Sequence, residues 1–214
     1  MNVTIIGTGN MARGIGTRLV VGGNAVTLVG REPEATAALA AELNQAAAKN
    51  GSAKAVSFGS PISDSVVILA LPYPAVSEVV QHYYSQLGGK IVVDITNILN
   101  PTYDDVGTPP GSSGAEEIAR LLPADAHLIK AFNTTFATPL VAGEVAGQPL
   151  DVLMAGDDAE SKKVLAGLIE AGKMRPIDAG PLKRARQLEG IGLLHITLQF
   201  TLNTSFRTAW KLLQ

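Results

Sequence analysis

The feature that most constrains the fold of this chain is a glycine-rich turn that directly follows an apolar run at its start. Residues 2–6 read Asn-Val-Thr-Ile-Ile, and residues 7–12 read Gly-Thr-Gly-Asn-Met-Ala. Apolar side chains then recur at helical spacing, at Met11, Ile15 and Leu19. A strand, a Gly-x-Gly-x-x-Ala turn and a helix in this order are typical of dinucleotide-binding folds.

Each small residue of this turn has a physical role in such a fold. Gly7 permits the tight turn, Gly9 lets the backbone approach a pyrophosphate, and Ala12 lets the helix pack on its strand. Free N–H groups at the helix N-terminus favour phosphate there. An ordinary turn is the alternative, because glycines also serve turns that bind nothing. We predict that a pyrophosphate binds along Thr8, Gly9, Asn10 and Met11.

The end of the next strand predicts which nucleotide is bound. Residues 25–29 read as a strand, and Gly30 and Arg31 follow it. A guanidinium pairs with a 2′-phosphate, whereas an acidic side chain at this place favours the ribose hydroxyls of NAD. Gly30 and Arg31 therefore favour NADP over NAD. Two alternatives remain: Glu32 reaches the ribose, or Arg31 is a solvated loop residue.

Composition excludes several classes of function. The chain has 214 residues, 46% of them hydrophobic and 17% charged, with a net charge of −2, so no nucleic-acid partner is expected. It has no cysteine, and its three histidines are scattered, so no metal site is predicted. The longest apolar stretch, 191–202, is too short and too polar to span a bilayer. Without a basic leader, a cytoplasmic location is the expectation.

The rest of the chain alternates short β-branched runs with helical stretches. Further strands are predicted at 53–58, 66–71, 90–95, 127–131, 151–155 and 174–178, and helices at 33–49, about 72–87 and 158–171. The clearest loop is 100–114, which is rich in Pro, Gly and Ser. This pattern predicts an α/β Rossmann domain over 1–181, with a doubly wound parallel sheet, and a small helical C-terminal lobe over 182–214.

Ligands of such sheets bind at the carboxyl ends of the strands. An apolar shelf over residues 71–75, with Leu71, Pro72, Tyr73 and Ala75, follows one predicted strand. The small polar residues Thr96 and Asn97 follow the next. Ala131 and Asn133 follow a third. We expect Pro72, Thr96, Asn97 and Ala131 to shape a nicotinamide pocket, with turn formation as the alternative for the polar residues.

Two further polar residues have both a functional and a structural interpretation. Lys130 either contacts a ligand or forms an ion pair with Asp94. His195, on the apolar stretch near the C-terminus, either assists protonation or is a core histidine satisfied by a neighbour. His195 and Asn133 are thus weak catalytic candidates. The sequence suggests no catalytic triad by spacing, which favours hydride transfer between two rings, a reaction that needs little proton machinery.

The chain resembles the NADP-dependent coenzyme F420 oxidoreductases. The resemblance rests on residues 7–11, Gly30-Arg31, 130–134 (Lys-Ala-Phe-Asn-Thr), 155–158 (Ala-Gly-Asp-Asp) and 178–182 (Asp-Ala-Gly-Pro-Leu). The same module resembles the cytoplasmic reductase domain of six-transmembrane ferric reductases. The resemblance implies that NADPH lies along residues 8–11 with its 2′-phosphate at Gly30 and Arg31.

The resemblance also implies a second ring stacked on the nicotinamide, either the deazaflavin coenzyme F420 or a flavin such as FAD or FMN. It implies that the lobe over 182–214 closes the cofactor cleft and supports a homodimer. Two alternatives come from other classes: an NADPH-binding redox sensor without turnover, and a reductase of a small organic substrate.

Overall fold

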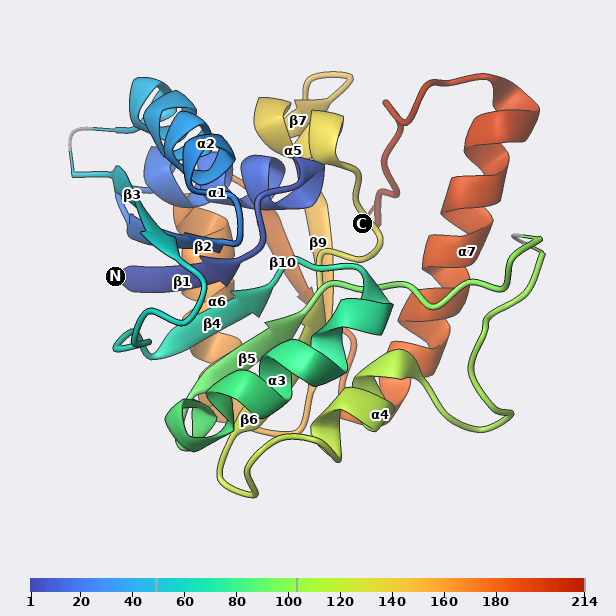
Figure 1. Cartoon of the computed structure of the whole chain (residues 1–214). Helices are drawn as coiled ribbons and strands as arrows, with labels where there is room; N and C mark the ends of the chain where they lie inside the picture. Colours follow the sequence, from blue (N-terminus) through green and yellow to red (C-terminus); the bar gives the residue numbers. More distant parts are fainter. Residues whose placement is uncertain (49, 103, 214) are drawn as a thin grey trace.

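The computed structural model describes residues 1–48, 50–102 and 104–213, and its centre is an eight-stranded sheet in the order β10-β9-β6-β5-β4-β1-β2-β3 (Figure 1). A separate two-stranded hairpin lies beside it. The strands of the sheet are β1 (Asn2–Ile6), β2 (Ala25–Gly30), β3 (Ser52–Ser57), β4 (Val66–Leu69), β5 (Ile91–Asp94), β6 (His127–Ala131), β9 (Asp151–Gly156) and β10 (Arg175–Asp178). The hairpin consists of β7 (Glu144–Val145) and β8 (Gln148–Pro149).

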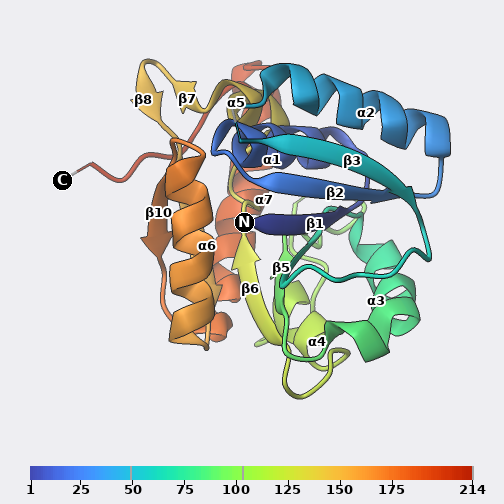
Figure 2. The same ribbon diagram turned by 90° about the vertical axis from the view of Figure 1, so that its left-hand side faces the viewer.

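Helices cover both faces of this sheet. They are α1 (Asn10–Val21), α2 (Pro33–Ala46), α3 (Tyr73–Leu87), α4 (Gly114–Ala119), α5 (Ala137–Ala142), α6 (Ala159–Ala171) and α7 (Ala185–Leu202), with a 3-10 turn η1 (Leu182–Arg184) before α7. Figure 2 shows α1 and α2 on one side of the strands and α3 and α4 on the other. The Rossmann fold predicted from the sequence is confirmed.

Period-two alternation along each strand divides the core into two layers. Ile5 of β1 packs in the layer that includes α1, α2, α5 and α6, whereas Ile6 packs in the layer of α3 and α4. Val66 and Val67 of β4 divide in the same way. Strands apolar at every position, such as β4, are therefore buried on both faces, as expected of central parallel strands.

The sheet is mostly parallel, as predicted, and one pair of strands departs from that arrangement. β9 pairs antiparallel with β6, with Lys130 opposite Ala155, and every other neighbouring pair of the sheet is parallel. The connection from β6 to β9 consists of α5 and the β7–β8 hairpin. β9 therefore begins at the same sheet edge at which β6 ends, and it runs in the opposite direction. As a result, β9 and β10 end at the edge opposite the carboxyl ends of β1, β4 and β5.

The C-terminal segment has the predicted helix and, after it, a tail that the sequence did not indicate. The helix α7 ends at Leu202, and the residues after it form an extended tail that returns to the main domain (Figure 1). The buried carboxylate of Asp151 holds this tail through Lys211 Nζ at 2.7 Å and the N–H of Leu212 at 2.8 Å. The helix α2 ends at Ala46. The sequence predicted its end at Lys49, which lies outside the described residues.

Candidate functional site

The glycine-rich turn joins β1 to α1 at the carboxyl edge of the sheet. Gly7 has φ +121°, and a Cβ there would lie 2.2 Å from the carbonyl oxygen of Ala70. Its N–H donates to the carbonyl of Val29 at 2.9 Å. Only glycine fits this position, because both the backbone angle and the neighbouring strand exclude a side chain.

Gly9 lies in the same turn and is exposed to solvent. It is the N-cap residue of α1, and a Cβ built on it meets no atom within 4 Å. Among the described residues no side chain caps this helix end. The first N–H groups of α1 therefore have no side-chain partner, and the positive end of the helix dipole lies at the same place. Helix ends of this kind bind phosphate groups.

Two adjacent clefts follow the carboxyl edge of the sheet on either side of this turn. The first, of about 340 Å³, extends toward β2, and the second, of about 310 Å³, extends toward β5. Of the sequence-predicted residues, Gly7, Thr8, Gly9, Gly30, Arg31, Leu71, Pro72 and Ala75 line the first cleft. Gly9, Asn10, Met11, Leu71, Pro72, Thr96 and Asn97 line the second. The structure thus brings twelve of the thirteen predicted cofactor residues together, in two halves that share Gly9, Leu71 and Pro72.

Arg31 lies at the rim of the first cleft and is oriented by two neighbours. Its Nη2 lies 2.6 Å from Glu78 Oε1, and its guanidinium lies 5.1 Å from the centre of the Phe58 ring. Gly30 before it leaves no room for a side chain, since a Cβ would lie 2.1 Å from Thr36 Oγ1. The cleft therefore presents a guanidinium beside an aromatic ring, which suits a phosphate next to a purine.

Thr96, a residue that lines the second cleft, has a buried polar atom without a partner among the described residues. Thr96 is 4% exposed, and its hydroxyl has no hydrogen-bond partner among the described residues. The neighbouring amide of Asn97 is occupied, because its Nδ2 donates to the carbonyl of Asn133 and its Oδ1 accepts from Asn133 Nδ2. Asn133 also donates to the carbonyl of Leu188. Asn133 therefore positions the wall of the cleft, and Thr96 supplies the free hydroxyl.

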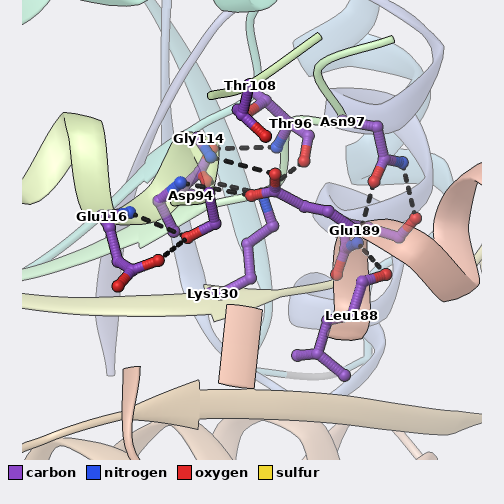
Figure 3. Close-up of polar contacts among 12 residues, drawn as sticks. Asp94, Thr96, Asn97, Thr108, Gly114, Glu116, Lys130, Leu188 and Glu189 are labelled. Carbon is purple, nitrogen blue, oxygen red and sulfur yellow. Dashed lines mark hydrogen bonds and ion pairs between the residues drawn. The ribbon is translucent and has the colours of Figure 1, made fainter. Parts of the chain in front are cut away.

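Lys130 forms the centre of a buried ionic cluster behind this wall (Figure 3). Its Nζ lies 2.7 Å from Asp94 Oδ2 and 2.9 Å from Glu189 Oε1, and it also donates to the carbonyl of Thr96. The ion pair with Asp94, one of the two sequence interpretations, is confirmed. We call Asp94, Lys130 and Glu189 the buried ionic cluster.

Ala131 differs from the other predicted cofactor residues. Its side chain is fully buried in the core of the domain and lines neither cleft. The residue after it, Phe132, has φ +63°, a strained conformation for a bulky side chain. β6 thus ends in a sharp turn that directs Ala131 inward and brings Asn133 toward Asn97.

His195 lies outside both clefts. Its ring packs 4.2 Å from that of Phe136, Nδ1 lies 3.2 Å from the carbonyl of Thr134, and Nε2 lies 2.9 Å from the Thr208 hydroxyl. Burial lowers the pKa of His195, against the weaker effect of the Thr134 carbonyl, so the ring is neutral at pH 7. This geometry favours the structural interpretation of His195.

Sequence reasoning missed one residue of the site. Glu189 is the carboxylate that α7 contributes to the cluster, and an acidic residue in an apolar helix was the signal that could have found it. Tyr73, which belongs to the predicted apolar shelf, lines the second cleft at the start of α3. Burial, and then the carboxylates of Glu117, Asp94 and Glu189, raise the pKa of its phenol, while Lys130 acts in the opposite direction.

Comparison with known families matches the part of the chain that carries both clefts. Residues 2–98 match the family described as "NADP oxidoreductase coenzyme F420-dependent". The chain is 36% identical over 191 residues to metalloreductase STEAP3 of Rattus norvegicus. The alignment covers 89% of this chain and 36% of the rat protein, so the chain spans about a third of that relative's length.

Solved structures resemble the whole chain. A candidate F420-dependent NADP-reductase from Arthrobacter sp. FB24 superimposes with a TM-score of 0.82 at 27% identity, covering 99% of both chains. A hypothetical protein from Sinorhizobium meliloti gives a TM-score of 0.75 at 27% identity, covering 85% of this chain and 86% of its own. Within the described residues no helix has the length and hydropathy needed to cross a membrane.

Proposed function

We propose that this chain, whose residues 2–98 match the family of coenzyme F420-dependent NADP oxidoreductases that its motifs resemble, transfers hydride between NADPH and a deazaflavin or flavin ring. The observation that carries the proposal is the pair of clefts that meet at the uncapped N-terminus of α1. A dinucleotide has two nucleoside halves joined by a pyrophosphate, and the site has the same division.

The residues present fit NADPH. The free N–H groups of α1 would hold the pyrophosphate, and Arg31 would pair with the 2′-phosphate in the first cleft. In the second cleft, the orphaned hydroxyl of Thr96 would bind the carboxamide of the nicotinamide. When bound, NADPH supplies the hydride, and the chain supplies orientation and exclusion of water.

Orientation in the second cleft comes from a rigid frame. Asn133 holds both polar atoms of the Asn97 amide, and the buried ionic cluster holds both backbone groups of Thr96. The apolar side chains of Met11, Leu71 and Ile95 line the cleft around these groups. Such a preorganised wall keeps two rings in reacting geometry. We assign no proton transfer to His195, because it lines neither cleft.

The test is anaerobic NADPH oxidation by the purified protein, with coenzyme F420 in one cuvette and FAD or FMN in another. Fast reduction of the deazaflavin is the result expected of an F420 enzyme, and reduction of flavin alone would indicate a flavin reductase. NADPH binding without turnover of either acceptor would contradict the proposal and favour the redox sensor or a small organic substrate.

A matched variant sharpens this test. Thr96→Val removes the free hydroxyl and keeps the shape of the side chain, so kcat is expected to fall about tenfold, the value of one lost hydrogen bond to a bound ligand. Thr197→Val, on the exposed side of α7, serves as the control. Equal activity of the two variants would remove Thr96 from the site.

The homodimer remains a proposal. The helix α7 supports it, because several of its polar side chains are buried while several of its apolar side chains are exposed. Glu189, His195 and Gln199 are buried, whereas Leu194, Phe200 and Leu202 are more than half exposed. A second copy of the chain would cover this apolar face. Phe200→Ser is expected to convert a dimer into a monomer in light scattering. A wild-type monomer at micromolar concentration would contradict the proposal.

A further inference from the structure

The buried ionic cluster holds two carboxylates and one ammonium group. The side chains of Lys130 and Asp94 are 0% exposed and that of Glu189 is 2% exposed. Among the described residues, Lys130 supplies the ion pairs of both carboxylates. One negative charge is therefore left without a counter-ion in a region that solvent does not reach. Burying an unpaired charge costs free energy, so the protein must stabilise this charge by other contacts.

Backbone N–H groups stabilise this surplus charge. The N–H of Thr96 donates to Asp94 Oδ1 at 2.9 Å, and the N–H groups of Gly114 and Ala115 donate to Glu189 at 2.9 and 3.2 Å. Each carboxylate thus accepts hydrogen bonds in addition to its ion pair with Lys130 (Figure 3). Every oxygen of the two carboxylates therefore faces an N–H or ammonium donor.

The cluster lies directly behind the second cleft. Thr96 lines that cleft, and both its N–H and its carbonyl bond to the cluster. Tyr73 lines the cleft from α3, and its phenol feels the carboxylates of Asp94 and Glu189 more than the opposing ammonium of Lys130. With two carboxylates and one ammonium, the cluster places one surplus negative charge directly behind the cleft.

We propose that the surplus negative charge of the buried ionic cluster makes the second cleft bind the oxidised nicotinamide more tightly than the reduced one. Loss of hydride, one proton with two electrons, converts the neutral dihydronicotinamide ring into a pyridinium with one positive charge. A fixed negative charge lowers the free energy of the pyridinium and leaves the neutral ring nearly unaffected. The cluster thereby favours hydride donation by NADPH. This inference rests on the proposed function.

The experiment measures two dissociation constants, one for NADP+ and one for NADPH, with no electron acceptor present. Glu189→Gln removes the surplus charge and keeps most of the shape of the side chain. We expect the Kd of NADP+ to rise about fivefold and the Kd of NADPH to change less than twofold, as for one charge across a partly screened cleft. Asp94→Asn removes the buried negative charge that β5 contributes and is expected to shift the ratio in the same direction.

Glu116→Gln is the matched control, because it also turns an acid into an amide on a neighbouring element. Glu116 pairs with Arg186 at the surface and lies outside the cluster, so the ratio of the two constants is expected to stay at the wild-type value. The ratio compares two ligands on the same folded protein, so a general loss of stability does not mimic the effect.

Two outcomes overturn the inference in distinguishable ways. If Glu189→Gln and Asp94→Asn weaken NADP+ and NADPH equally, the cluster only holds the fold of the cleft, and the proposed function still stands. If the wild-type protein binds neither form, the proposed function fails together with the inference.

Discussion

Arg31 and Glu78 form an ion pair at the rim of the first cleft, with Nη2 of the arginine 2.6 Å from Oε1 of the glutamate. The pair joins the loop after β2 to the helix α3. Both side chains are more than half exposed, so the pair contributes little to stability. Its consequence is functional: in the proposed complex a carboxylate competes with the 2′-phosphate for the same guanidinium.

Arg31→Ala is expected to raise the KM for NADPH about 10- to 100-fold and to leave the KM for NADH nearly unchanged. The reason is the loss of charge-assisted hydrogen bonds, worth about 1.5 to 3 kcal/mol, to a phosphate that NADH lacks. Steady-state kinetics with both nucleotides check this, with Arg120→Ala as a surface control. Equal effects of Arg31→Ala on both nucleotides would remove the phosphate assignment.

Glu78→Gln is expected to act in the opposite direction and lower the KM for NADPH about two- to fivefold. An exposed ion pair is worth at most about 1 kcal/mol, which limits the gain. Because salt screens such pairs, the gain is expected to shrink between 0.05 and about 0.5 M salt. Glu160→Gln removes an exposed charge on α6 and serves as the control. A higher KM in Glu78→Gln would show that Glu78 does not compete.

Gly7 and Gly9 of the glycine-rich turn are expected to respond very differently to substitution by alanine. Gly7→Ala places a methyl group against the Ala70 carbonyl at a positive φ, which destabilises the fold by about 3 kcal/mol or more. Gly9→Ala meets open space at φ −78°, so the melting temperature stays within a few degrees while NADPH binding weakens. Thermal melts and NADPH titration of both variants check the contrast. A large loss of stability in Gly9→Ala would contradict it.

The tail after α7 is expected to detach in acid. Burial opposes ionisation of Asp151, but hydrogen bonds from Arg175, Lys211 and the Leu212 N–H outweigh it and lower the pKa of Asp151 to about 2. A carboxyl with a pKa below its unfolded value of 3.8 stabilises the fold fully above pH 3.8, and this stabilisation disappears as the pH falls toward 2.

The size of this effect follows from the same values. The difference corresponds to about 2 kcal/mol at neutral pH. Denaturation of Asp151→Asn is expected to show that loss at pH 7 and no difference from the wild type near pH 2. Fluorescence of Trp210, which lies in the tail, reports its detachment. Equal stability of the two proteins at pH 7 would contradict the prediction.

Sequence reasoning located the first cleft well and the second only in part. Thr96 and Asn97 were predicted because small polar residues follow a strand, yet Ala131, chosen by the same rule, is buried. The positive φ of Phe132 turns the chain at the end of β6, and no local pattern indicates such a turn at a phenylalanine. The antiparallel β9 was missed for a similar reason, since a strand has the same apolar pattern in either direction.

The sequence by itself determined the strand and helix with which the Rossmann fold begins, the glycine-rich turn between them and the position of Arg31. These features depend on consecutive residues, because a tight turn and a helix N-terminus bind phosphate through their own backbone. Only the tertiary structure decided the second cleft and the buried ionic cluster. Asp94, Lys130 and Glu189 come from β5, β6 and α7, and a charge that no solvent reaches is stable only where packing brings its partners within hydrogen-bond distance.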